Sequence, residues 1–339
     1  MSRATGIGIG LLAALAASVG VATAFGSADV TVAEVGRVVL DRLGLAAGPS
    51  ETAGIIVWEL RLPRVLLAAA VGGGLSVVGV AMQALVRNPL AEPYLLGVSS
   101  GASAGAALFY LGFLPPLVSR ALSLPLAAFL GALAAIVLVV LVARQGSRLP
   151  TARLLLAGVA LSALLASVTA FVTYASPDPG KLRAVLFWLL GSFAGAGWER
   201  VALPAAASLL GLGMLWALAR PLDALLTGEE PAESLGVPVE ALKRVLVGLA
   251  ALVTGLLVAA SGVIGFVGLI VPHAVRFGVG VGHRRVVPLA FLAGAVFLVW
   301  ADLAARTVLP DQELPVGVLT ALCGVPFFLV LLRRLGPVG

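Results

Sequence analysis

Side chains that could carry out catalysis are scarce in this sequence of 339 residues. There are two histidines, His273 and His283, and one cysteine, Cys323, which lies in an apolar run. Neither histidine has a carboxylate at metal-ligand spacing along the chain, so a structural or interfacial role is favoured over metal binding. No Ser/His/Asp arrangement and no paired carboxylates stand out. We therefore expect no catalytic residue, no metal site and, with one cysteine, no intrachain disulfide.

A nucleotide site is not indicated either. No Gly-x4-Gly-Lys-Ser/Thr phosphate loop occurs, so the chain is not expected to bind ATP by that route. The glycines Gly278, Gly280 and Gly282 alternate, but the strand–turn–helix context of a dinucleotide site is missing around them. The sequence therefore predicts a chain that is not an enzyme.

Charged residues lie mostly between the apolar runs. The nearest case to an intramembrane charge pair is Asp302 with Arg306, which are four residues apart near the end of one predicted helix and could pair on one helix face. Transporters coupled to protons or sodium ions usually place acidic residues near the membrane midplane. Because the apolar runs contain almost none, we expect the energy source for any transport to lie on another protein.

The composition is that of a chain surrounded by lipid. Hydrophobic residues make up 60% and charged residues 11% of the sequence, against about 25% charged in soluble proteins. The mean hydropathy is +1.12 and the pI is about 10.4. The basic residues are scattered in ones and twos between apolar runs, which is typical of membrane anchors and not of a nucleic-acid surface. We predict an all-α polytopic membrane protein, with residues 1–339 forming a single transmembrane domain.

The length accommodates roughly ten spans of ~20 residues with short connections. Ten spans place both termini on the same side of the membrane. At the N-terminus, a cleaved signal peptide is the alternative to a retained first span, but the apolar stretch is longer than the usual signal core, which favours the span. The predicted helices lie at 5–25, 61–86, 94–112, 120–143, 151–174, 200–219, 241–261, 263–280, 286–306 and 315–333, the eighth being short, glycine-rich and able to form a broken or re-entrant segment.

The distribution of positive charge predicts the orientation. By this assignment thirteen of the 22 lysines and arginines lie on the side of the two termini, which is therefore expected to be cytoplasmic. Segment 26–60 is then extracytoplasmic and has apolar residues at near-helical spacing, which favours a surface helix. Segment 220–239 is cytoplasmic. Its residues 227–236 predict a short helix in which Thr227 and Glu230 have capping-box spacing, exposed as a docking point for a partner or serving only as a connector.

Several stretches of this sequence resemble the FecCD family, the permease subunits of ABC importers for iron–siderophore complexes, haem and vitamin B12. The resemblance covers the chain from about residue 58 to its end, with the motifs in order. The matching stretches are 61–64 (RLPR), Gln83 with 91–93 (AEP), 96–103 (LGVSSGAS), 153–158 (RLLLAG), 188–192 (WLLGS), 228–229 (GE) with 234–237 (SLGV), 265–273 (GFVGLIVPH), and 313–320 (ELPVGVLT) with 326–328 (PFF).

The resemblance implies a multi-pass permease of the inner, or cytoplasmic, membrane that works with other proteins. The partners implied are a second permease copy (a homodimer, or half of a heterodimer), two cytoplasmic ABC ATPases that carry ATP and Mg, and an extracytoplasmic binding protein. No cofactor on this chain and no nucleic acid are implied. Arg61, Arg64 and Arg306 match arginines that grip acidic residues of the binding protein, since arginine offers a planar fork to carboxylates. Without the resemblance, anchoring of Arg61 and Arg64 at lipid headgroups is the favoured explanation.

Two further sets of residues are carried over from the family. The set matching the coupling helix, which sits in a cleft of the ATPase, comprises Thr227, Gly228, Glu229, Glu230, Ala232, Ser234, Leu235 and Gly236. The set matching the cytoplasmic gate comprises Asn88, Pro89, Leu90, Thr151 and Ala152, where Ala152 replaces a serine of the vitamin B12 permease. The predicted function is ATP-driven import of an iron chelate, a siderophore or haem, by alternating access. Cobalamin import is the alternative within the family, and a stand-alone secondary transporter is the alternative outside it.

Overall fold

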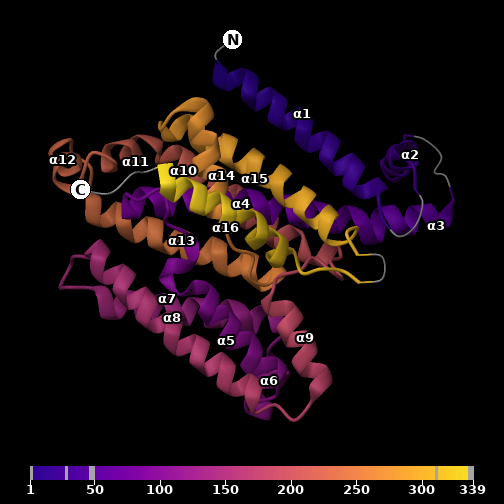
Figure 1. The fold of residues 1–339 in the computed structure, drawn as a ribbon, viewed down its shortest axis with the longest axis horizontal. Helices are drawn as coiled ribbons and strands as arrows, with labels where there is room; N and C mark the ends of the chain where they lie inside the picture. Colours follow the sequence, from indigo (N-terminus) through magenta and orange to yellow (C-terminus); the bar gives the residue numbers. More distant parts are fainter. Residues whose placement is uncertain (1–2, 27–29, 46–49, 310–311, 335–339) are drawn as a thin grey trace.

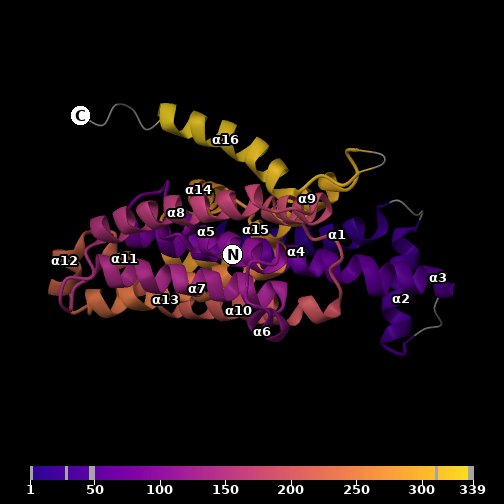
Figure 2. The same ribbon diagram turned by 90° about the horizontal axis from the view of Figure 1, so that it is seen from below.

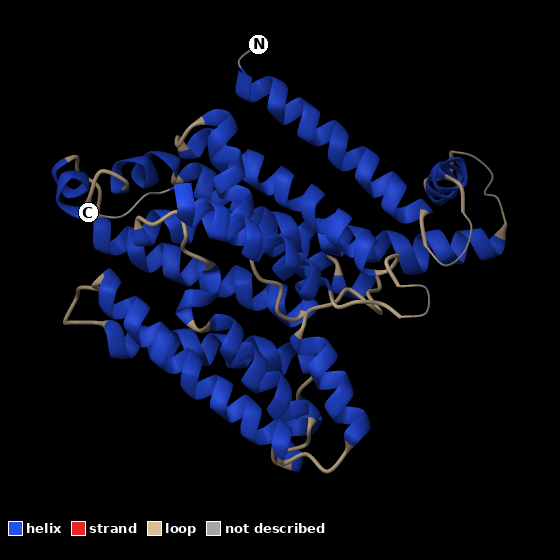
Figure 3. Ribbon diagram, in the orientation of Figure 1, coloured by secondary structure: helices blue, strands red, loops and turns tan. Residues whose placement is uncertain are grey.

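The computed structural model describes residues 3–26, 30–45, 50–309 and 312–334. The elements in these ranges are helices of α, π or 3-10 type, and a lone bridge between Gln145 and Arg148 is the only strand-like pairing among them (Figure 3). The predicted all-α fold is therefore confirmed. Because lipid offers no hydrogen-bond partners, a helix, which satisfies its own backbone, is the natural spanning element.

In the described ranges, the ten helices whose bounds follow run along the bundle, in agreement with the predicted number. They alternate in direction, and α1 begins on the same side as α16 ends (Figure 1). Their bounds are α1 Arg3–Ala24, α4 Leu62–Val86, α5 Val98–Tyr110, α7 Leu124–Ala143, α8 Thr151–Tyr174, α10 Ala202–Ala217, α13 Val239–Ser261, α14 Val267–Val279, α15 His283–Ala305 and α16 Val316–Arg334.

Short elements lie toward the two ends of this bundle. We call the end that carries α12 (Glu229–Ser234) the inner end, and the end that carries α2 (Val32–Arg42) and α3 (Glu51–Gly54) the outer end. The remaining short elements are η1 Ile55–Arg61, η2 Pro93–Leu96, α6 Pro116–Ala121, α9 Pro179–Leu189, η3 Trp198–Arg200 and α11 Ala219–Leu225.

Seven helical segments in the described ranges are long and apolar enough to cross a bilayer. The others that run along the bundle are shorter. α14 has 13 residues, which at 1.5 Å per residue cover about 20 Å of a core that is about 30 Å thick. α5 also has 13 residues and continues from the 3-10 turn η2 through Gly97, which has φ = 76°. The predicted short eighth helix is confirmed.

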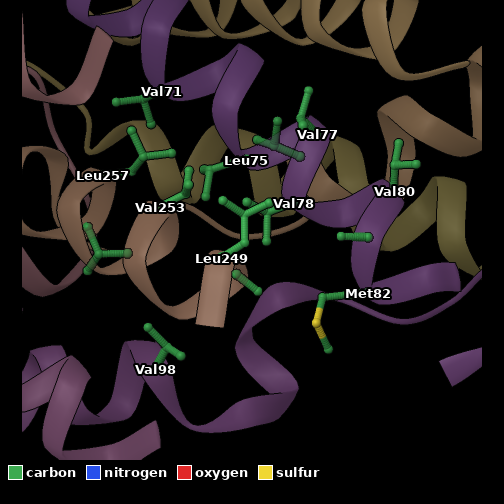
Figure 4. Packing of buried hydrophobic residues seen from close by; sticks show 14 of the residues in the cluster. Val71, Leu75, Val77, Val78, Val80, Met82, Val98, Leu249, Val253 and Leu257 are labelled. Atoms are coloured by element: carbon green, nitrogen blue, oxygen red, sulfur yellow. The ribbon is translucent and has the colours of Figure 1, made fainter. Parts of the chain in front are cut away.

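The core is built around α4, most of which is buried. Its glycines allow close backbone contact: a Cβ on Gly72 would overlap the carbonyl oxygen of Gly294 on α15, and one on Gly79 would overlap that of Gly268 on α14. In lipid the hydrophobic effect does not drive helices together, so helix association depends on close packing, which small residues at the crossings allow. On another side, Val71, Leu75 and Val78 of α4 and residues of α13, including Val253 and Leu257, belong to one buried cluster (Figure 4).

The second span starts earlier than predicted. The sequence places its start at Arg61, because Pro63 suits a first helical turn. In the structure the helix is continuous from Glu51 to Val86, begins after Ser50, whose hydroxyl accepts from the N–H of Ala53, and passes Pro63 through the π-helical segment η1. There the N–H of Leu62 bonds to the carbonyl of Val57, five residues back. The wider π turn accommodates a proline inside the helix, and segment 26–60 therefore contributes the surface helix α2 and the beginning of this span.

Two other differences concern short helices. Helix α9 was not predicted, and Asp178 caps it by accepting from the N–H groups of Gly180 and Lys181. The predicted helix 120–143 is divided into α6 and α7, with Ser123 capping α7 and Pro125 in its first turn. Helix α16 lies on the outside of the bundle, and Figure 2 shows its C-terminal part standing away from the other helices.

Candidate functional site

Charged side chains from three remote parts of the sequence meet at the outer end. The guanidinium of Arg64 on α4 donates through Nε and Nη2 to Asp302 on α15, with Nη2 to Oδ1 at 2.8 Å. Its Nη1 donates to both carboxylate oxygens of Glu313, at 2.9 and 3.0 Å. The side chain of Asp302 is 1% exposed and that of Glu313 is 40% exposed. Arg64 is thus held by a buried carboxylate and by one that water can reach.

The other two predicted docking arginines hold the end of α1. Arg61 donates to the carbonyl oxygens of Thr23 and Ala24, and Arg306 donates to those of Ala22 and Phe25. The last carbonyls of a helix lack intrahelical partners and carry partial negative charge, so arginine suits this position. The predicted pairing of Arg306 with Asp302 is present, with Nε 3.5 Å from Oδ2.

The structure therefore brings Arg61, Arg64 and Arg306 together at the outer end. All three side chains face the protein and are largely buried, which does not fit simple anchoring at lipid headgroups. The sequence did not indicate the role of Asp302 and Glu313 toward Arg64, because 238 and 249 residues separate them from it.

The predicted coupling residues form a turn and a short helix at the inner end. Gly228 has φ = 128°, and α12 follows it from Glu229 to Ser234. The predicted capping box is wrong: the Thr227 hydroxyl donates to the carbonyl of Ala224 instead, and no side chain caps α12. The reason is that Gly228 takes the N-cap position, where its unusual backbone angles need a residue without Cβ.

The surface of α12 is divided between buried and exposed residues. Ala232 is fully buried, whereas Glu230, Glu233, Ser234 and Leu235 are exposed, Leu235 at 72%. The helix ends at Ser234, and Gly236 beyond its cap has φ = 83°. A large apolar side chain beside acidic groups at an aqueous end is a feature of surfaces that bind another protein.

The predicted gate residues occupy two separate places at the inner end. Asn88 follows the left-handed cap Arg87 of α4, and its side-chain oxygen accepts from the N–H of Leu90, at 2.9 Å. This turn is an Asx turn, which fixes residues 88–90. Thr151 and Ala152 begin α8, and Thr151 donates to Glu229 of α12, at 3.3 Å. Among the described residues no hydrogen bond joins the Asn88 turn to Thr151.

The two histidines lie in two different helices. His273 lies inside α14 between Phe277 and Phe327. His283 begins α15 and is fully buried, with Nδ1 2.6 Å from Oδ1 of Asp223 on α11. In the part of the chain that the structure describes, no group of three or more His, Cys, Asp or Glu residues could hold a metal ion.

A wide-open apolar pocket of about 630 Å³ lies beside α16. It is lined by Leu189 and Leu190 at the end of α9, by Val263 and Phe266 before α14, and by residues of α16 that include Val318 and Leu322. A wall of aliphatic and aromatic groups offers contact area to an apolar solute without fixing it by hydrogen bonds.

The sequence matches the FecCD transport family over residues 11–334. The chain belongs to the FecCD transport family. Two relatives support this assignment. The cobalamin import system permease protein BtuC of Halobacterium salinarum is 45% identical over 85% of this chain and 76% of its own. The hemin transport system permease protein HmuU of Yersinia pestis is 45% identical over 82% of this chain and 83% of its own.

A solved structure supports the same assignment. It is described as an inward-facing conformation of a metal-chelate type ABC transporter, is 31% identical, covers 98% of this chain and 99% of its own, and superposes with a TM-score of 0.81. This FecCD chain is thus a multi-pass permease subunit of an ABC importer for metal chelates in the cytoplasmic membrane. It is not itself catalytic, and ATP belongs to a partner ATPase.

Asp302 is the test of the outer charge cluster. In Asp302→Asn, Arg64 and Arg306 lose their buried counter-ion, and we expect a loss of about 3–5 kcal/mol in stability because an uncompensated buried charge remains. The measurement is the thermal unfolding midpoint of the purified permease in detergent. Glu199→Gln is the control, because that exposed side chain has only a 3.7 Å surface pair with Arg200. Equal midpoints for the two variants would contradict the role given to Asp302.

Proposed function

We propose that this permease imports an iron chelate, a siderophore or haem. The observation that carries the proposal is the open apolar pocket beside α16 in a chain of the FecCD transport family. The 45% identity to a hemin permease supports it. Iron chelates are large, and their ligands cover the metal, so an apolar wall is suited to passing them without strong binding. Cobalamin is the second candidate, supported by the equal identity to a cobalamin permease.

The proposed assembly is the permease with a second copy of itself or a similar chain, two cytoplasmic ATPases and an extracytoplasmic binding protein. Exposed apolar residues on α8 and α16 support the presence of a second copy. Such apolar faces are suited to contact either lipid or a second permease, and we propose that the second copy covers part of them. The exposed residues include Leu156, Val159 and Phe171 on α8, and Leu322 and Leu329 on α16. In this assembly the inner end faces the cytoplasm.

The outer end is the proposed docking site for the binding protein, through Arg61, Arg64 and Arg306. These side chains already have partners, so docking has to replace a contact. Glu313 is the accessible partner of Arg64, with its side chain 40% exposed. We infer that a carboxylate of the binding protein takes the place of Glu313 on the Arg64 guanidinium, while the buried Asp302 stays paired.

The inner end is the proposed contact with the ATPase. Helix α12, with its preceding turn from Thr227, presents Glu230, Glu233 and Leu235 to solvent. When the ATPase pair closes on ATP, α12 moves with it, and the segments at Asn88–Leu90 and Thr151–Ala152 open or close the cytoplasmic end of the pathway. The energy for alternating access therefore comes from outside this chain.

The cargo is tested by reconstitution. The permease is placed in vesicles with the ATPase and the binding protein encoded beside it, and uptake of radiolabelled haem, a ferric siderophore and cobalamin is measured with and without ATP. We expect ATP-dependent uptake of an iron chelate. ATP-dependent uptake of cobalamin alone would contradict the proposed cargo and leave the proposed mechanism in place. Uptake that does not depend on ATP would instead support a stand-alone transporter.

If a carboxylate of the binding protein replaces Glu313 on Arg64, weakening the Arg64–Glu313 pair should make the binding protein dock more tightly. In Glu313→Gln the charge is lost and the shape is kept, and we expect the binding protein to bind about two- to fivefold more tightly, as a partly exposed ion pair allows. The affinity is measured by surface binding to the permease in nanodiscs. The matched control is Glu199→Gln, another exposed acid at the outer end, which should leave the affinity unchanged. Weaker or unchanged binding of the binding protein to Glu313→Gln would contradict the proposed exchange at Arg64.

The ATPase contact is tested at the exposed leucine. Leu235→Ala removes apolar area that the fold does not use, so we expect unchanged permease stability and a loss of about 1–2 kcal/mol in ATPase binding, in the range of an interface anchor. Co-purification of the ATPase at graded concentrations reports the loss. Leu252→Ala, on the exposed side of α13 within the bundle, is the control. Full retention of the ATPase by Leu235→Ala would count against α12 as the contact.

A further inference from the structure

Lys243 on α13 is a large, buried and charged side chain at the inner end, and the proposed function does not use it. Its side chain is 2% exposed. The ammonium donates to Glu229 at 2.6 Å, to Glu240 at 3.0 Å and to the carbonyl oxygen of Leu149 at 3.3 Å. An ammonium group has three donors, and all three are used here.

The three acceptors come from three different elements. Glu229 is the first residue of α12, Glu240 lies in the first turn of α13, and Leu149 is in the connection between α7 and α8. The second oxygens of both carboxylates extend the cluster: that of Glu240 accepts from the N–H of Leu149, at 2.7 Å, and that of Glu229 accepts from Thr151, at 3.3 Å. Lys243 therefore joins α12, α13 and the start of α8.

The cluster is placed where little else fixes α12. This helix has six residues, too few to be stable alone, and Ala232 is its one buried residue. The side chains of Glu229 and Glu240 are 33% and 26% exposed, so water could solvate both carboxylates if Lys243 were absent. A buried ion pair is a weak source of stability, and its better attested use is to fix one arrangement among several.

We propose that Lys243 is a positioning residue that transmits movement of α12 to Thr151 at the start of α8. This inference rests on the proposed coupling and gate functions and names the link between them. When the ATPase moves α12, Glu229 moves with it and takes the Lys243 ammonium and the Thr151 hydroxyl along. Without the lysine, the two carboxylates repel each other, the bond to the Leu149 carbonyl is lost, and only the 3.3 Å Thr151–Glu229 hydrogen bond still links α12 to α8.

The test is the ratio of ATP hydrolysed to cargo imported in the reconstituted complex. The probe is whichever of radiolabelled haem, ferric siderophore or cobalamin the wild type takes up. Lys243→Met keeps the length of the side chain and removes the charge. We expect it to assemble with the ATPase and to hydrolyse ATP, while the ratio rises about tenfold, which is within the usual range of coupling between sites. The control is Arg244→Met, which removes the neighbouring exposed charge and should leave the ratio unchanged.

A double variant separates transmission from a loss of stability. If Lys243 acts through Glu229, then Lys243→Met combined with Glu229→Gln should raise the ratio no further than the larger single effect, because the two residues share one interaction. An unchanged ratio in Lys243→Met, a lower thermal midpoint with a normal ratio, or additive effects in the double variant would each overturn the inference. If the wild type itself imports cargo without ATP, the proposed function fails instead.

Discussion

Charges in a helical bundle that lies in lipid have to be paired inside the protein or placed at an aqueous end, because an isolated charge in hydrocarbon is too costly. This constraint sorts the polar groups of the FecCD chain described here. The buried charges Arg64 and Asp302 belong to the outer cluster, and Lys243 belongs to the inner one. Between them, α4 crosses the bundle mainly on glycine and aliphatic contacts, with added hydrogen bonds from Ser208 to the carbonyl of Ala70 and from Gln83 to the carbonyls of Gly268 and Leu269. The functional surfaces are therefore at the ends, and the middle supplies a packed frame.

The same constraint explains what the sequence could predict of the fold. Apolar runs of about 20 residues predict spans, and the shorter apolar runs between them complete the ten helices that alternate in direction. Local chemistry was less informative. Pro63 is equally suited to a helix start and to a π-helical turn, and only the packing of η1 against α1 and α2 decides between them. Thr227 has the spacing of a cap, but the backbone of Gly228 places α12 one residue further on.

The sequence predicted which arginines form the outer cluster, but not all of the residues that they contact. Arg61, Arg64 and Arg306 were identified through the family, and the structure groups them. The pairing of Arg306 with Asp302 was predicted from their spacing. The counter-charges of Arg64 could not be identified, since Asp302 and Glu313 are remote from it in sequence and reach it only when α4, α15 and the segment before α16 come together. Lys243 gave still less signal, because in the sequence it is one of several basic residues near a span end, and its burial depends on the connection 144–150 folding over it.

The two clusters also differ in what they join, and the difference bears on transmission. The outer cluster joins α1, α4 and α15 into one unit. Its arginines Arg61 and Arg306 donate to backbone carbonyls of the chain at the end of α1, and these carbonyls are fixed in place by the helix. The inner cluster joins a six-residue helix to two spans through exposed carboxylates. Because α13 packs against α4 through residues such as Val253 and Leu257, a displacement that reaches Lys243 acts on a span held to the frame. The next element joined to the cluster is then α8, through the Thr151–Glu229 hydrogen bond. Movement entering at α12 is therefore expected at the start of α8, beside the proposed pathway, and not at the outer end.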